Sequence, residues 1–149
     1  MAGSVISVNT SEKKGMRKKP VPEISVSADF GIQGDAHASS DWHRQVSLLA
    51  LESIKKMQEK GLDVHPGDFA ENITTEGIDL VALPLGTHVS IGATVLGEVS
   101  QIGKECHTRC AIYYQAGDCV MPKEGIFIKV LRGGTVKAGD PVEVLPDRS

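Results

Sequence analysis

The clearest structural pattern in the 149-residue chain is the stretch Gly125-Ile126-Phe127-Ile128-Lys129-Val130-Leu131. Ile126, Ile128 and Val130 recur at every second position, which places their side chains on one face of an extended segment. Such β-branched residues pack well on a pleated surface. The stretch therefore predicts a β-strand with one buried face.

Short runs of the same kind lie before and after this stretch. They are rich in β-branched residues, alternate in polarity and cover Val5–Val8, Ile24–Ala28, Val89–Gly92, Thr94–Ile102 and Val142–Leu145. Glycine accepts positive φ and proline fixes φ, so turns are expected at Pro84–Gly86, Arg132–Gly134 and Ala138–Pro141. Many short strands separated by turns are typical of a mainly antiparallel β-barrel.

One segment has the period of a helix. Its apolar residues recur every three positions, at Leu48, Leu51, Ile54 and Met57. We expect a helix over Leu48–Lys60, with Ser47 as its N-cap and Gly61 as its C-terminal stop. The predicted fold is mainly β, a barrel with one main amphipathic helix and short helical turns, and residues 1–149 are expected to form a single domain.

Composition narrows the class of protein. The formal net charge is -3, from 16 basic and 19 acidic residues, whereas a nucleic-acid-binding domain normally has a strongly basic face. The start of the chain, Met1–Val8, lacks the basic and apolar regions of a secretory leader. No run of about 18 apolar residues could span a membrane. We expect a soluble cytoplasmic protein that does not bind nucleic acid.

Reactive chemistry is expected in the run Gly103-Lys104-Glu105-Cys106-His107-Thr108-Arg109-Cys110. The thiolate is the reactive and metal-binding form of cysteine, and neighbouring cations favour it. Cys106 and Cys110 are therefore candidate reactive thiols.

These cysteines have three other interpretations. Cysteine is often buried as a small apolar residue, but this run is polar. A disulfide would leave one of the three cysteines unpaired, and nothing marks the chain as secreted. A zinc site could use Cys106, His107, Cys110 and Cys119, although the spacing matches no common closed zinc site. Cys119 follows an expected turn and is expected to be packed.

A second candidate region is a basic run between the first two expected strands. It contains Lys13, Lys14, Arg17, Lys18 and Lys19. Lysine binds phosphate as a point charge and arginine can bind it bidentately, so the run would suit a dianionic ligand. The alternative is a solvated loop without a ligand.

Three segments, taken in order, resemble the MOSC domain, the barrel named after the C-terminal part of molybdenum-cofactor sulfurases. The first is Gly31-Ile32-Gln33-Gly34-Asp35-Ala36-His37 with the later His43–Leu49, and the second is Pro66-Gly67-Asp68-Phe69-Ala70-Glu71-Asn72-Ile73. The third is the cysteine run. Arg109-Cys110 is similar to the Ser-Arg-Cys form of molybdenum-containing reductases, whereas Glu105-Cys106 corresponds to a Pro-Cys in stand-alone members.

The resemblance implies a small stand-alone MOSC barrel that binds a molybdopterin-type molybdenum cofactor, without pyridoxal phosphate. Cys110 is favoured as the principal thiol and molybdenum ligand, with Cys106 as the alternative or a second sulfur partner. The expected cofactor contacts are Lys13, Lys14, Arg17, Lys18, Lys19, Asp35, His37, His43, Arg44, Glu71, Asn72 and Arg109. Glu71 and Asn72 could equally have structural hydrogen-bonding roles.

Two kinds of function follow from this resemblance. One is an active thiol, either a persulfide sulfur carrier or a molybdenum-ligating thiolate that reduces N-oxygenated substrates. The other is a non-catalytic module that shelters the cofactor for a partner, a cofactor-biosynthesis protein or a molybdoenzyme. A small zinc-binding barrel is a further alternative.

Overall fold

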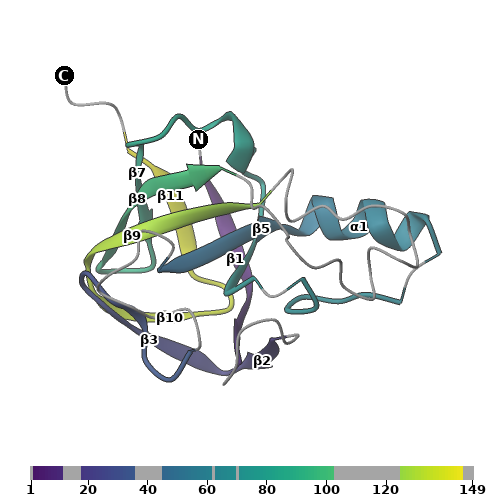
Figure 1. The fold of residues 1–149 in the computed structure, drawn as a ribbon, viewed down its shortest axis with the longest axis horizontal. Coiled ribbons are helices and arrows are strands. Elements are labelled where there is room, and N and C mark those ends of the chain that lie inside the picture. Colours follow the sequence, from purple (N-terminus) through teal and green to yellow (C-terminus); the bar gives the residue numbers. More distant parts are fainter. Residues whose placement is uncertain are drawn as a thin grey trace.

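A computed structural model describes residues 2–11, 18–35, 45–61, 63–69, 71–102 and 125–145. Within these residues, seven strands close into a barrel (Figure 1). They are β1 (Ala2–Thr10), β5 (Val46–Ala50), β6 (Ile73–Glu76), β7 (His88–Ile91), β8 (Val95–Ile102), β9 (Ile126–Arg132) and β11 (Pro141–Val144). Their order is β11-β7-β8-β9-β5-β6-β1, and the pairing of β11 with β1 completes the circle. The predicted mainly β barrel is confirmed.

Four short strands extend this barrel. β3 (Glu23–Ser27), β4 (Gly31–Ile32) and β10 (Gly134–Lys137) form a three-stranded sheet, and β2 (Lys19–Val21) pairs with the end of β1. The pairing of β5 with β6 is parallel, which makes the barrel mixed. β3 matches an expected strand, whereas β2, β4, β5, β6 and β10 had not been predicted.

The barrel interior is filled by alternating apolar side chains. On β5, Val46, Leu48 and Ala50 belong to the core cluster, and Ser47 and Leu49 alternate with them. Leu48 is fully buried. Burial of one such side chain stabilises the fold by about 1.5–3 kcal/mol.

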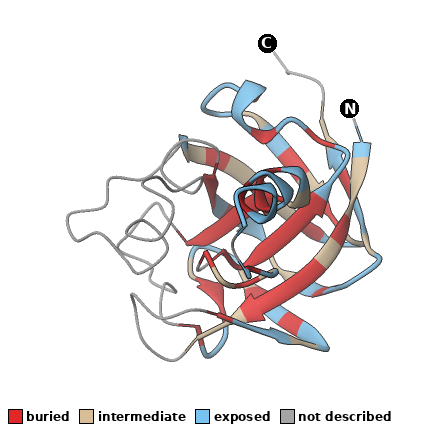
Figure 2. Ribbon diagram, turned by 90° about the vertical axis from the view of Figure 1, so that its right-hand side faces the viewer, coloured by how far each residue is buried: buried red, intermediate tan, exposed pale blue. Residues whose placement is uncertain are grey.

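The helix α1 (Leu51–Glu59) continues from the end of β5 and extends away from the barrel (Figure 1). Ile54 and Met57 are buried but are not members of the barrel core cluster. Figure 2 views the helix along its axis and colours its residues by burial. A 3-10 turn, η1 (Leu80–Ala82), is the second helical element in the described residues. None of the helices in these ranges is long and apolar enough to cross a membrane.

The predicted start of the helix was wrong. Residues Val46–Ala50 form a strand, so Ser47 is not an N-cap and the helix begins at Leu51. Leu48 pairs with Ile126 on β9 and with Ile73 on β6, and two neighbouring strands satisfy its backbone better than one helical turn would. Gly61 does follow the helix, with φ +90°. Three-residue spacing could not distinguish a buried strand leading into a helix from one longer helix.

Replacing Leu48 tests the barrel core. We expect Leu48→Ala to lower the free energy of unfolding by about 2–5 kcal/mol, because it opens a cavity in a fully packed interior. Leu85, which is 64% exposed, provides the matched control, and Leu85→Ala should change stability little. Urea denaturation measures both. Equal effects of the two substitutions would contradict the assignment of Leu48 to the core.

Candidate functional site

A buried ion pair joins two of the predicted site residues. Lys18 Nζ lies 2.8 Å from Asp35 Oδ1, and both side chains are 0% exposed. Lys18 Nζ also donates to Ser11 Oγ at 3.0 Å, and the Ser11 amide donates to Asp35 Oδ1 at 3.1 Å. Removing a charge from water is costly, so such a pair persists only where its geometry and hydrogen bonds compensate. The pair fixes the chain just after β1, just before β2 and just after β4.

A tight turn at Gly67 packs against this ion pair. Gly67 has φ +93°, a conformation that suits glycine, and a Cβ at this position would clash with the carbonyl oxygen of Lys18. The carbonyl of Gly67 accepts a hydrogen bond from the Lys18 amide at 2.8 Å. Gly31, at the start of β4, and Gly34, just after β4, also have positive φ. Any larger residue at position 67 would push this turn away from Lys18.

Glu71 is fully buried and accepts hydrogen bonds from uncharged donors. Its carboxylate accepts from the Thr74 hydroxyl at 2.8 Å and from the Phe69 amide at 3.3 Å. Burial raises the pKa of Glu71 from 4.5 to about 6, and hydrogen bonds from Gly67, Thr74 and Phe69 oppose that rise. The carboxyl group can therefore change its charge close to neutral pH.

Asn72 connects the start of β6 to β5 and β1. Its Oδ1 accepts from the Ser47 amide at 2.9 Å and from the Ser47 hydroxyl at 3.1 Å. Its Nδ2 donates to the carbonyl of Asn9 at 3.3 Å. Asn9 in turn donates to the Glu71 carbonyl at 3.2 Å and to Thr74 Oγ1 at 3.3 Å. These contacts form one buried polar network across three strands.

The structure brings the described candidates together in two linked groups. Lys18 pairs with Asp35, Glu71 lies next to Asn72 in the network, and the Gly67 turn contacts both groups. Lys19 is exposed at the start of β2. The hydrogen bonds given above for Glu71 and Asn72 are all made within the protein, and their contact with a cofactor remains a prediction.

The remaining candidates lie outside the described residues. They are Lys13, Lys14, Arg17, His37, His43, Arg44, Cys106, Arg109 and Cys110, and the same holds for His107 and Cys119 of the zinc alternative. Across the part of the chain that is described, no group of three or more His, Cys, Asp or Glu side chains is placed to hold a metal ion.

The barrel does fix where the cysteine-containing stretch begins and ends. β8 ends at Ile102 and β9 begins at Ile126, and these two residues are register partners. Both ends of residues 103–124 therefore join neighbouring strands at the same edge of the barrel. Ile126 also pairs with Leu48 on β5, three residues before the start of α1. Figure 1 shows the end of β8, the start of β9 and the start of α1 on the same side of the molecule.

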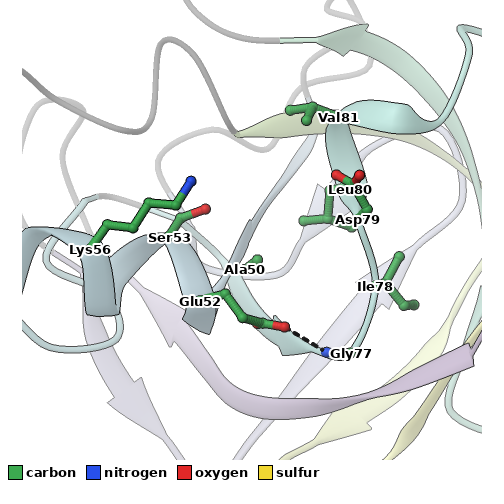
Figure 3. A pocket seen from close by; sticks show the side chains of 9 residues that line it. All are labelled: Ala50, Glu52, Ser53, Lys56, Gly77, Ile78, Asp79, Leu80 and Val81. Atoms are coloured by element: carbon green, nitrogen blue, oxygen red, sulfur yellow. Dashed lines mark hydrogen bonds between the residues drawn. The ribbon is translucent and has the colours of Figure 1, made fainter.

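A pocket of about 330 Å³ lies at the start of α1 (Figure 3). The segment after β5 and the segment after β6 line it, through Ala50, Glu52, Ser53, Lys56, Gly77, Ile78, Asp79, Leu80 and Val81. Glu52 Oε2 accepts a hydrogen bond from the Gly77 amide at 3.0 Å and joins the two walls. Sequence reasoning missed these residues because the rest of α1 and the strand β6 separate the two segments along the chain, and the segments become neighbours only when β5 and β6 pair.

Three features define the class of protein. They are a closed mixed β-barrel with one helix, the buried pair Glu71-Asn72, and a cysteine run in the sequence between two adjacent strands. The chain matches the MOSC domain over residues 33–143 and belongs to that family. The resemblance noted from the sequence is therefore confirmed.

Solved structures show the same fold. The YuaD protein of Bacillus subtilis superposes with a TM-score of 0.80 at 18% identity, over 97% of this chain and 96% of that chain. YiiM of Geobacillus stearothermophilus gives 0.70 at 20% identity, over 97% and 75%. YiiM of Escherichia coli gives 0.67 at 23% identity, over 100% and 72%. No curated protein matches the sequence significantly.

The raised pKa of Glu71 predicts a pH-dependent stability. A carboxyl group whose pKa is about 6 when folded and 4.5 otherwise binds its proton more tightly in the folded state. Its stabilising contribution is therefore complete below about pH 4.5 and is lost as the pH rises through about 6. The loss amounts to about 2 kcal/mol.

Urea denaturation between about pH 4.5 and pH 7.5 measures this effect against Glu71→Gln, which keeps an acceptor oxygen but cannot ionise. The free energy of unfolding of the wild type should fall relative to that of the variant across this range. Parallel curves for the two proteins would show that Glu71 is not responsible.

The ion pair predicts a contrast between two neighbouring lysines. Lys18→Met should lower the free energy of unfolding by about 3–5 kcal/mol, because it leaves Asp35 buried without its cation. Lys19→Met, at an exposed position, should change it by less than about 0.5 kcal/mol. Chemical denaturation at one pH compares the two. Similar values for both variants would contradict the burial of the pair.

Proposed function

We propose that this MOSC-domain protein binds a molybdenum cofactor and handles its sulfur or its molybdenum through a reactive cysteine. The main support for this proposal is the family match over residues 33–143, a range that includes both the pair Glu71-Asn72 and the cysteine run. The family is associated with molybdenum cofactor. Cys110 is the proposed principal thiol, with Cys106 as its partner or alternative.

The residues present have the chemistry that such a cofactor requires. A thiolate is a soft donor that suits molybdenum, and lysine and arginine suit a phosphate group. Lys13, Lys14, Arg17 and Lys19 would supply cations, together with Arg109. When bound, the cofactor would supply the metal and its dithiolene sulfurs. The ion pair of Lys18 and Asp35 and the Gly67 turn support the chain on which several of these residues lie.

In the sulfur-carrier form, an external persulfide donor transfers its outer sulfur to the Cys110 thiolate and leaves as a thiolate. Cys110 then holds a persulfide. A nucleophilic acceptor takes that outer sulfur, and the Cys110 thiolate is regenerated. Alternatively the Cys106 thiolate attacks the inner sulfur, forms a disulfide with Cys110 and releases hydrosulfide. In the reductase form, the Cys110 thiolate ligates molybdenum instead.

One observation favours the non-catalytic alternative, a module that shelters the cofactor for a partner enzyme. Four of the five described candidates, Lys18, Asp35, Glu71 and Asn72, are buried and contact the protein itself. Residues arranged in this way stabilise a binding surface and do not themselves react with a ligand. The partner would be a cofactor-biosynthesis protein or a molybdoenzyme, in the cytoplasm.

Persulfide loading tests the thiol. Wild type, Cys106→Ser, Cys110→Ser and the control Cys119→Ser are incubated with a small persulfide donor, and mass spectrometry detects the gain of one sulfur atom. We expect Cys110→Ser to lose loading and Cys119→Ser to retain it, with all variants equally stable, because only the nucleophilic thiolate is removed. Loss in Cys106→Ser alone would make Cys106 the principal thiol.

Loading that persists in the double variant Cys106→Ser/Cys110→Ser would contradict the active-thiol proposal. Cofactor binding without loading in any protein would favour the sheltering module. Metal analysis of the purified protein separates both from the zinc alternative, since molybdenum is expected and stoichiometric zinc would contradict the proposal.

A further inference from the structure

We propose that the pocket between α1 and η1 binds a small zwitterion of amino-acid size, with its carboxylate at Lys56 and its ammonium group at Asp79. None of the residues that line this pocket was among the candidates from the sequence.

The pocket has an apolar floor of suitable size. Its volume of about 330 Å³ is within the range of small-molecule sites. Ala50, Ile78 and Leu80 line it and are also members of the barrel core cluster, so the floor is the outermost layer of that core. Val81, at the rim, is 38% exposed. An aliphatic side chain of a ligand would extend this apolar layer.

The two walls of the pocket carry opposite charges. Ser53 and Lys56 are three residues apart on one face of α1, and Asp79 lies on the opposite wall beside η1 (Figure 3). Both Lys56 and Asp79 are exposed to solvent and can be reached by a ligand. An ammonium group has three donors, so Lys56 can bind a carboxylate while it keeps another contact. Glu52 accepts a hydrogen bond from the Gly77 amide and so links the two walls.

A buried hydroxyl lies next to the pocket floor. Thr75 is the register partner of Ala50, which lines the pocket, and its side chain is fully buried. Thr75 Oγ1 has no hydrogen-bond partner among the described residues. A buried polar atom of this kind is unusual and is often satisfied by water or a ligand. It is consistent with a polar molecule at this end of the barrel.

The position of the pocket indicates what the ligand does. Ala50 is two residues beyond Leu48, the register partner of Ile126, and Ile126 follows the cysteine-containing stretch. The pocket thus opens at the edge of the barrel where residues 103–124 begin and end. We assign it to the small-molecule donor or acceptor that the thiols serve. That assignment rests on the proposed function, whereas binding in the pocket does not.

Binding is tested by titration of the full chain with L-leucine, followed by amide chemical shifts in NMR. Isocaproate lacks the ammonium group of leucine, and isoamylamine lacks its carboxylate. We expect leucine to shift the amides of Ser53, Gly77 and Val81, and each analogue to bind at least about tenfold more weakly. Weak binding of leucine with shifts elsewhere, or equal binding of all three, would overturn the proposal.

Matched variants test the charged walls. Lys56→Gln and Asp79→Asn should each weaken leucine binding about tenfold, because each removes one charge-assisted contact. Lys55→Gln and Asp63→Asn change exposed charges outside the pocket and should leave the affinity unchanged. If the control variants weaken leucine binding as much as the pocket variants do, leucine does not bind at Lys56 and Asp79, and the proposal is contradicted.

The double variant Cys106→Ser/Cys110→Ser separates this inference from the proposed function. It should bind leucine like the wild type. If leucine binds but the wild type shows no persulfide loading, the proposed pocket stands and its link to the thiols is contradicted. If the wild type is loaded with persulfide normally but does not bind leucine, the proposed function stands and the proposed pocket is contradicted.

Discussion

The pairing of β1 with β11 closes the barrel, and the rest of the structure depends on that closure. Ala2, Gly3 and Ser4 pair with Glu143, Val142 and Pro141, so the two ends of the described chain become neighbouring strands. A closed sheet has no unpaired edges, and its interior excludes water from every strand at once. Asn9 on β1 and Ser47 on β5 alternate with core residues and therefore lie on the outside of this barrel wall.

That outer side of the barrel carries a group of polar residues that are buried and hydrogen-bonded to one another. Asn72 joins β5 and β1 through Ser47 and Asn9, and Glu71 accepts hydrogen bonds from uncharged donors. Each hydrogen bond alone contributes little, but a buried polar group without a partner costs about twice what a hydrogen bond contributes. The network therefore selects one position for the segment between α1 and β6, and through Gly67 one position for Lys18.

The short strand β5 separates two regions with different chemistry. Ser47, near its start, contacts the polar network, and Ala50, at its end, lines the pocket at α1. Because β5 also pairs with β9, the end of β5 lies beside the start of β9, which follows the cysteine-containing stretch. The barrel thus places a supported polar region and an accessible small-molecule pocket a few residues apart on one strand.

Local patterns in the sequence determined the mainly β class, most strands with alternating apolar residues, the body of the helix from Leu51 and the MOSC family. They could do so because side-chain periodicity and motif order are local properties. They did not determine whether Leu48 belongs to a strand or a helix, because that depends on Ile73 and Ile126, which are distant in the sequence.

The same limit applies to the site. A run of basic residues identified Lys18 as a candidate, but only the fold decided that it is buried against Asp35 while its neighbour Lys19 stays exposed. Likewise, the sequence marked Glu71 and Asn72, and the folded chain supplied their partners. Contacts between residues far apart along the chain form only when the barrel closes, so burial, ion pairing and the pocket were decided by tertiary structure alone.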